Sequence, residues 1–415
     1  MGLKILLLLL SRLSFAEPSY ITFPSDIDWR RQSSEHFEII FASGSDRFAE
    51  RTLTAAEKAY RLLKPVFPET PSKTFIVLSE WQDSTNGYAL NFPYPHMVIF
   101  ASPPASRGQL AAVDAWLDSL VLHEFVHIVH LYPAHGLWSP MRTVFGSWVV
   151  PNGLMPSHLH EGMAVFWETE LTKGGRGRGE LFSMYRLKAV EAGVWGESFV
   201  PIDRMDGVLS VYPHGISAYF FGHELYADLW KRKGAKGFTE LTDSFSSNWP
   251  YWINIPFEEV YGKSYRDLWK ETFDRTRKES LVELESIKKK PLSKLRYLTQ
   301  SRFVKSEIAL SPNGKQLLVK RATPQEGEYA VVMSLDSKEI ANTVNIEAQG
   351  AEGICWITVA GKQWWIYNAG SSRYQHSENS LYAYSLEDKK FIRLDTHDGS
   401  LTHVHRLACA PDLSS

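Results

Sequence analysis

His123, Glu124 and His127 have the side chains and the spacing of a hydrolytic metal centre. They form a His-Glu-x-x-His pattern inside an apolar run, residues 110–131, that predicts a helix. Residues four apart share one face of a helix, so both imidazoles can point at one metal ion. The Glu124 carboxylate can then reach a water held by that ion. Catalytic zinc takes three protein ligands and keeps a fourth position open, so two histidines supply only part of such a site.

A third ligand is expected from a second helix that packs against the first. The helix-like run 157–171 follows Pro156 and carries Glu161, Gly162 and Glu168. A carboxylate is an acceptable zinc ligand, and a glycine lets two helices approach each other closely. Glu168 comes seven residues after Glu161, nearly on the same helix face, where it could hold a metal-binding histidine by a hydrogen bond.

Other polar residues near these motifs are not expected to bind the metal. We interpret His130 as a packed or hydrogen-bonded neighbour, and His158 and His160 flank Glu161, where helix geometry points them away from it. The glycine-rich run 173–179 has the glycines and basic residues of a phosphate-binding loop. It lacks the Gly-x-x-x-x-Gly-Lys-Ser/Thr pattern, however, and follows a helix rather than a strand. It is predicted to be a mobile basic loop near the cleft.

The elements that must position these side chains begin with an α/β unit. The residue pattern predicts strands over 36–41, 73–78 and 97–101, and a helix over 45–63. The strand over 97–101 could pair with an extended substrate backbone by strand addition.

A mostly helical segment follows, from about residue 110 to residue 290. The predicted helices cover residues 110–131, 157–171, 181–191, 212–233 and 264–288. The run Lys288-Lys289-Lys290, followed by the helix breaker Pro291, predicts a linker at the end of this segment.

Beyond residue 295 the pattern changes to short β-like runs that contain a repeat. Ser311-Pro312-Asn313-Gly314-Lys315 lies in the first unit, and related units begin near Ile354 and Leu407. This spacing, roughly 45 to 50 residues, suits a four-stranded propeller blade. The segment resembles the TolB-like family of β-propellers, whose blades open with a Ser-Pro-Asp/Asn-Gly-Lys turn. The resemblance implies about two blades over 296–415, an incomplete propeller, since closure needs at least about four. The alternative is a small β-sandwich.

Three motifs in a fixed order give a second resemblance. His-Glu-x-x-His at 123–127 is followed by Glu161-Gly162-x-Ala164 and then by Tyr212-x-x-Gly215. This order resembles the gluzincin zinc metallopeptidases, with the aminopeptidase N-like, or peptidase MA-like, catalytic domain closest in pattern. The resemblance implies an α+β, zincin-like domain with an α/β subdomain over 17–109 and a helical zinc-binding subdomain over 110–290.

The same resemblance implies the role of each residue. His123, His127 and Glu161 would hold Zn²⁺, and Glu124 would act as the general base for the attacking water. Tyr212 would donate a hydrogen bond to the transition state.

Two departures from the family pattern affect the expected specificity and loop structure. No Gly-x-Met-Glu-Asn strand, which binds the free amine of an aminopeptidase substrate, occurs between residues 92 and 109. An endopeptidase-like specificity is therefore favoured over trimming of single residues. The interval from His127 to Glu161 is longer than is usual in the family, which implies an inserted loop over about 132–154.

Composition and the N-terminal segment limit which partners, metal sites and cellular locations the sequence allows. The net charge of −2 over 415 residues gives no basic field, so nucleic acid is excluded as a partner. Cys355 and Cys409 are the only cysteines, which excludes a thiolate zinc site, although the pair could form a disulfide. Residues 1–16 have the basic start, short apolar run and small-residue exit of a secretory signal peptide. No apolar run is long enough for a stable membrane span.

The sequence thus predicts a secreted or periplasmic zinc metallopeptidase that hydrolyses peptide bonds in a peptide or protein substrate. A protein partner could bind the propeller. The alternative is a catalytically weak or inactive, metal-containing binding or scaffold protein that acts through its propeller.

Overall fold

A computed structural model describes most of the α/β, helical and β-rich segments that the sequence predicts. The described residues are 23, 25–82, 85–104, 115–195, 202, 216–291, 304–323, 327–336, 340–344, 353–373, 376–394 and 407. The predicted signal peptide and Tyr212 lie outside them.

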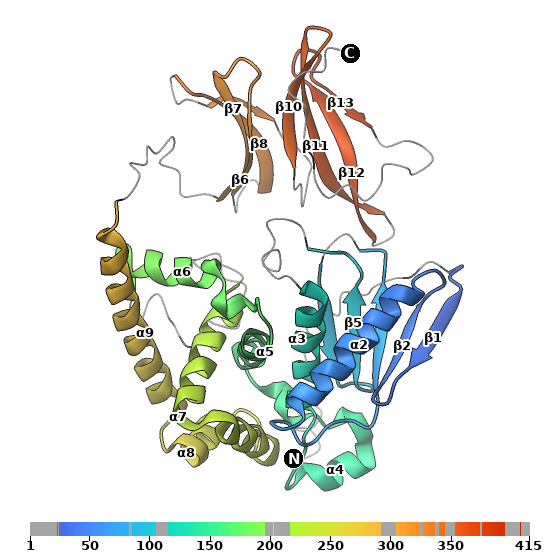
Figure 1. Ribbon diagram of the computed structural model, residues 1–415, viewed down its shortest axis with the longest axis vertical. Coiled ribbons are helices and arrows are strands. Elements are labelled where there is room, and N and C mark those ends of the chain that lie inside the picture. Colours follow the sequence, from blue (N-terminus) through green and yellow to red (C-terminus); the bar gives the residue numbers. More distant parts are fainter. Residues whose placement is uncertain are drawn as a thin grey trace, which may run out of the picture.

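A five-stranded mixed sheet opens the fold (Figure 1). Its strands lie in the order β1-β2-β3-β5-β4, where β2, β3 and β5 are parallel and the two edge strands pair antiparallel. The strands are β1 (Trp29–Ser33), β2 (Phe37–Ala42), β3 (Thr74–Ser79), β4 (Gly87–Leu90) and β5 (His96–Phe100). The three strands predicted from the sequence are confirmed to within one residue, and the two edge strands are additional.

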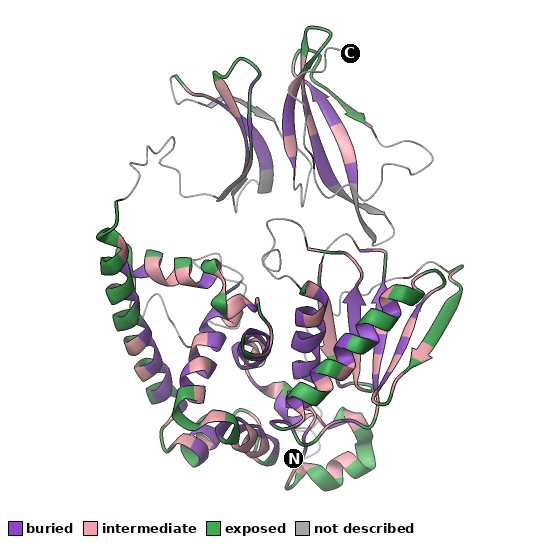
Figure 2. Ribbon diagram, in the orientation of Figure 1, coloured by how far each residue is buried: buried purple, intermediate pink, exposed green. Residues whose placement is uncertain are grey.

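Helices α2 (Asp46–Leu63) and α3 (Trp116–Leu131) pack against each other and against this sheet. Every residue of α3 from 119 to 130 is buried (Figure 2). A helix that is buried on all sides is a core element. Phe125 of α3 packs edge-on against Phe37 of β2, with ring centroids 5.1 Å apart. The His-Glu-x-x-His segment is therefore fixed inside the core and not carried on a surface loop.

Six further helices lie in the described part of the chain. They are α4 (Trp138–Phe145), α5 (Ser157–Leu171), α6 (Glu180–Glu191), α7 (Ser217–Ser247), α8 (Asn254–Tyr261) and α9 (Tyr265–Lys288). The predictions for α5, α6 and α9 are confirmed to within one residue. α7 extends past its predicted end at 233, because the chain bends at Gly234 (φ 59°) and resumes as helix.

Helices α5 and α7 cross closely at two glycines. A Cβ atom on Gly162 would lie 2.4 Å from the Cα of Gly222, and one on Gly222 would lie 2.1 Å from the carbonyl oxygen of His158. Real Cβ atoms do not approach backbone atoms this closely, so neither position accepts a side chain without moving a helix. The close approach that Gly162 predicts is confirmed, and it lies one residue from Glu161.

Replacing Gly222 by alanine is expected to lower the free energy of unfolding by at least about 2 kcal/mol, because the added methyl group must push α5 and α7 apart. Chemical denaturation monitored by circular dichroism measures the loss. Gly153→Ala is the matched control, since a Cβ there would meet only side-chain atoms of Val150, the nearest at 3.3 Å. Equal stability of the two variants would show that the crossing tolerates separation.

Two four-stranded antiparallel sheets follow α9, each with its strands in sequence order. The first contains β6 (Val304–Leu310), β7 (Gln316–Thr323), β8 (Gly327–Ser334) and β9 (Ile340–Val344). The second contains β10 (Ile354–Val359), β11 (Lys362–Arg373), β12 (His376–Ser385) and β13 (Lys390–Arg393). This meander is the strand order of a propeller blade. The described residues form no closed propeller, so the propeller stays a prediction.

Two local features of these sheets match the sequence. Gly314 has a φ of 71° and donates its N–H to the carbonyl of Ser311 at 2.9 Å, as expected for the Asn313-Gly314 turn. Cys355 of β10 is disulfide-bonded, and the only other cysteine in the sequence is Cys409. Among the described helices, none combines the length and the apolarity that a membrane span needs.

Candidate metal centre

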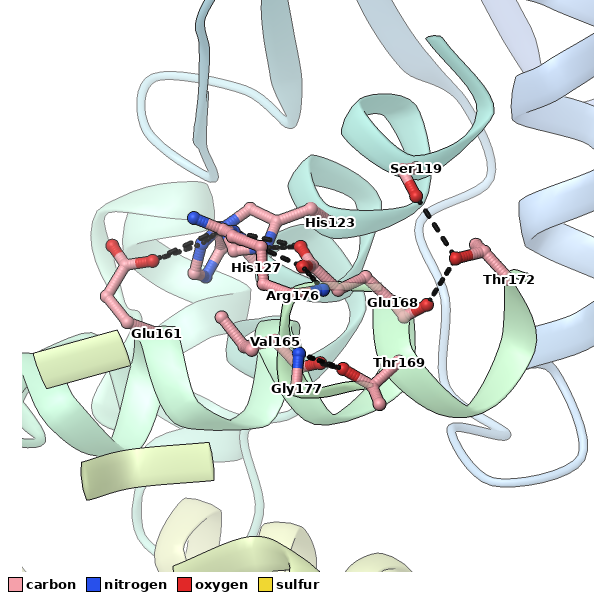
Figure 3. A network of polar contacts seen from close by, with 10 residues as sticks. All are labelled: Ser119, His123, His127, Glu161, Val165, Glu168, Thr169, Thr172, Arg176 and Gly177. Atoms are coloured by element: carbon pink, nitrogen blue, oxygen red, sulfur yellow. Dashed lines mark hydrogen bonds and ion pairs between the residues drawn. The ribbon is translucent and has the colours of Figure 1, made fainter. Parts of the chain in front are cut away.

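Three potential metal ligands converge between α3 and α5 (Figure 3). The Nε2 atoms of His123 and His127 lie 3.3 Å apart. The Oε2 atom of Glu161 lies 3.3 Å from the first and 3.5 Å from the second. His123 and His127 lie 38 and 34 positions before Glu161 in the sequence, so only the packing of the two helices brings the three side chains together.

The spacing of these three atoms fits one bound cation. Ligands placed about 2.0–2.1 Å from a tetrahedral zinc ion lie about 3.3–3.4 Å from one another. Two imidazole nitrogens and one carboxylate oxygen are also a donor set that divalent transition metals accept. The residues present therefore fit a metal ion with three protein ligands and an open position.

The ligand side chains differ in exposure. Those of His123 and His127 are 6% and 11% exposed, whereas that of Glu161 is 24% exposed. Burial disfavours the charged form of Glu161, but the charge of His127 and hydrogen bonds from both histidines outweigh burial and hold its pKa well below the ordinary value. Glu161 is therefore ionised and ready to bind a cation throughout the neutral range.

His123 is protonated at neutral pH when no metal is bound. Burial and the nearby Arg176 lower its pKa, but hydrogen bonds to Glu161 and Glu168 and the charge of Glu168 raise it more, to about 9. A metal ion must displace this proton in order to bind.

Metal affinity is accordingly expected to rise with pH below about 9. Each proton displaced contributes about tenfold per pH unit, and the raised pKa of His123 places its contribution across the neutral range. Competition with a chelator of known affinity at a series of pH values measures the slope. Glu161 adds nothing to it, since its carboxyl is already ionised. An affinity independent of pH between about 6 and 8 would contradict the protonated state of His123.

Glu124 lies in the core beside the triad and faces the edge of the sheet. It is 5% exposed, and burial raises the pKa of its carboxyl. A Cβ atom on Gly87 of β4 would lie 3.2 Å from the Cγ of Glu124. The absence of a side chain at Gly87 therefore leaves room for the Glu124 carboxylate next to an edge strand.

The strand predicted to pair with substrate is not at the edge of the sheet. β5 is hydrogen-bonded to β3 on one side and to β4 on the other, so its backbone groups are already used. The strand addition expected over 97–101 is therefore wrong. β4 is the edge strand on this side among the described residues, and it is the strand that borders Glu124.

Glu168 contacts the ring nitrogen of His123 that points away from the triad. Its Oε2 lies 3.0 Å from the Nδ1 of His123, and the side chain is 1% exposed. Burial opposes its ionisation, but Arg176 and His123 lower the pKa to about 2. An ionised carboxylate in this position holds the proton of His123 on Nδ1, which leaves Nε2 free to bind a metal.

Two residues at the site were missed by the sequence reasoning. Arg176 contacts both Glu168 and His123. Tyr219 of α7 stacks on the ring of His123 at a centroid distance of 6.4 Å, and burial raises the pKa of its phenol well above the ordinary value. Tyr219 lies on the helix predicted over 212–233, but the residue pattern does not indicate which face of that helix meets α3.

The neighbouring histidines lie outside the triad. His130 is buried, and burial lowers its pKa well below the ordinary value, so it packs as a neutral ring. His158 is hydrogen-bonded to the hydroxyl of Tyr265. His160 donates to the carbonyl of Asn152 at 2.9 Å.

Comparisons with known proteins add little to this geometry. No protein-family model matches the chain, and no curated protein matches it. Among solved structures, it is similar to the crystal structure of Legionella pneumophila aminopeptidase A in complex with aspartic acid, with 13% identity and a TM-score of 0.32. The similarity covers 77% of this chain and 35% of that one, so the chain spans about a third of that protein's length. So distant a likeness carries no functional argument, which must come from the site itself.

Proposed function

We propose that the chain is a zinc-dependent metallopeptidase in which His123, His127 and Glu161 hold Zn²⁺ and Glu124 is the general base. The observation that carries the proposal is the convergence of three ligand atoms at 3.3, 3.3 and 3.5 Å. A buried carboxylate next to them, on the same helix as the histidines, gives the centre a hydrolytic rather than a purely structural composition.

The roles of the residues follow from their positions. Zinc held by these three residues would supply Lewis acidity for activating a water and polarising the substrate carbonyl. Glu124 accepts the proton of the attacking water and passes it to the leaving amine, and the raised pKa of its carboxyl favours the first of these transfers. Tyr219, beside the triad, and Tyr212, from the family resemblance, are the two phenols proposed to donate a hydrogen bond to the developing oxyanion.

The substrate we propose is an extended peptide segment of an unfolded protein. β4 offers an edge beside Glu124, and an extended chain can add to such an edge by backbone hydrogen bonds. We place the enzyme in the periplasm or outside the cell. The bonded Cys355 supports this, because disulfides persist in oxidising compartments.

One experiment tests the proposal directly. The purified protein should contain one zinc ion per chain and cleave an unfolded protein substrate, lose that activity to a chelator and regain it with added zinc. Bound zinc with no cleavage of any member of a peptide library would instead favour the scaffold function. A protein that binds no metal after exposure to zinc would overturn both.

A further inference from the structure

The glycine-rich run 173–179 packs directly against the metal centre. A short 3₁₀ turn, Arg176–Arg178, follows α5 and lies between α5 and α7. A Cβ atom on Gly175 would lie 2.2 Å from the Cα of Thr169, and one on Gly177 would lie 2.1 Å from the Nε2 of His223. Both glycines are therefore required for the turn to fit between the helices. This fit contradicts the prediction of a mobile basic loop at Arg176, whose side chain is packed against the centre.

The polar contacts described for Arg176 go mainly to the buried carboxylate of Glu168, and its Nη2 also lies 2.9 Å from the Nδ1 of His123. Its Nε donates to the Oε1 of Glu168 at 2.8 Å, and its Nη2 donates to the Oε2 at 2.8 Å. Its backbone N–H donates to the same Oε1 at 2.9 Å. The Arg176 side chain is only 12% exposed. Three donors on one carboxylate fix both the position and the rotation of that group.

The fixed carboxylate is the one that contacts His123. The Oε2 of Glu168, which accepts from Arg176, is also 3.0 Å from the Nδ1 of His123. When the Nε2 of His123 binds a metal, Nδ1 carries the proton and donates it to this oxygen. The Nη2 of Arg176 lies 2.9 Å from the same Nδ1, but a guanidinium nitrogen and a protonated ring nitrogen are both donors and form no hydrogen bond with each other, so the guanidinium acts on the ligand through Glu168.

Tyr219 contacts both Arg176 and His123. The guanidinium of Arg176 lies over its ring, 4.9 Å from the centroid, and the same ring stacks on His123. The imidazole is thus bounded by a carboxylate and an aromatic ring, and Arg176 contacts both.

We propose that Arg176 is a positioning residue that fixes Glu168 on His123 and so sets the orientation of one metal ligand. The inference rests on the proposed metal site, but it concerns affinity and coordination geometry and does not require peptide cleavage. Arg176 contributes no group to the reacting atoms.

The test compares three variants by zinc affinity, measured by chelator competition, and by the visible spectrum of the Co²⁺-substituted protein. Arg176→Met, which keeps length but removes every side-chain donor, is expected to weaken zinc binding by about 10–100-fold, the usual effect of losing an outer partner of a ligand. Arg176→Lys keeps the charge but not the paired donors, and should bind zinc several-fold more weakly with a shifted Co²⁺ spectrum. Arg178→Met is the control, because Arg178 is 51% exposed and bonds only to groups outside the centre.

A double variant tests the route through Glu168. If Arg176 acts through that carboxylate, Glu168→Gln should weaken binding in the wild-type background but add little to Arg176→Met. Additive losses would overturn the proposed route.

The outcomes separate this inference from the proposed function. If the wild type binds no zinc, the metal site itself fails. If the wild type binds zinc and a folded Arg176→Met has the same affinity and Co²⁺ spectrum, Arg176 is not a positioning residue. Should Arg176→Met fail to fold, Arg176→Lys decides: wild-type affinity and spectrum in that variant overturn the inference.

Discussion

Replacing Glu124 by glutamine is expected to lower kcat/KM for an unfolded protein substrate by about 10²–10⁴-fold, the usual contribution of a general base. Glutamine has nearly the same shape and fills the same buried space beside Gly87, but it cannot accept the proton of the attacking water. Initial cleavage rates over a range of substrate concentrations give the change. Zinc content should remain that of the wild type, because Glu124 is not a member of the triad.

The matched control for Glu124→Gln is Glu170→Gln, which makes the same chemical change on α5. Glu170 is 40% exposed and pairs with Arg178 at the surface, away from the triad. It should leave both zinc content and activity unchanged. A Glu124→Gln protein that keeps its zinc and cleaves at the wild-type rate would refute the role of Glu124.

Replacing Glu161 by alanine is expected to have the largest effect on the metal. The variant loses one of three protein ligands, so zinc affinity should fall by more than about 100-fold, the upper end of what the loss of an outer partner causes. Chelator competition measures the affinity, and cleavage should disappear at zinc concentrations that saturate the wild type.

Glu170→Ala again serves as the control, since it removes a carboxylate from the same helix without touching the triad. Retention of zinc by the Glu161→Ala variant at wild-type affinity would mean that another group supplies the third ligand.

The long helices could be predicted because their apolar patterns are local. α5 begins and ends at the predicted residues, and α9 begins after Ser264, whose hydroxyl accepts from the backbone N–H of Asp267. α4 was not predicted, because none of its residues is buried and its sequence has no apolar face directed at a core. It lies within the insertion expected over 132–154.

The order of strands in a sheet is not a local property, and here the sequence reasoning was wrong. The apolar run at β5 marks a buried strand, and an interior strand satisfies that pattern better than an edge strand. β4 has four residues and no buried side chain, so its pattern was too short and too weak to indicate a strand. The strand that faces Glu124 therefore became visible only in three dimensions.

The residues of the candidate site also differ in whether local sequence predicts them. His123, Glu124 and His127 lie within one helical turn, and their spacing alone suggested a shared face. Arg176 reaches the site through a turn whose path depends on two glycines and on two neighbouring helices. Its role depends on contacts between segments far apart in sequence, and no spacing rule describes them.

The unequal exposure of the three ligands sets a direction for metal exchange. The two imidazoles are sealed in the core, while the Glu161 carboxylate reaches toward water. At the proposed site an incoming cation would therefore meet the Glu161 carboxylate before the two imidazoles. A departing ion would leave that carboxylate last, so the motion of one acidic side chain would govern exchange.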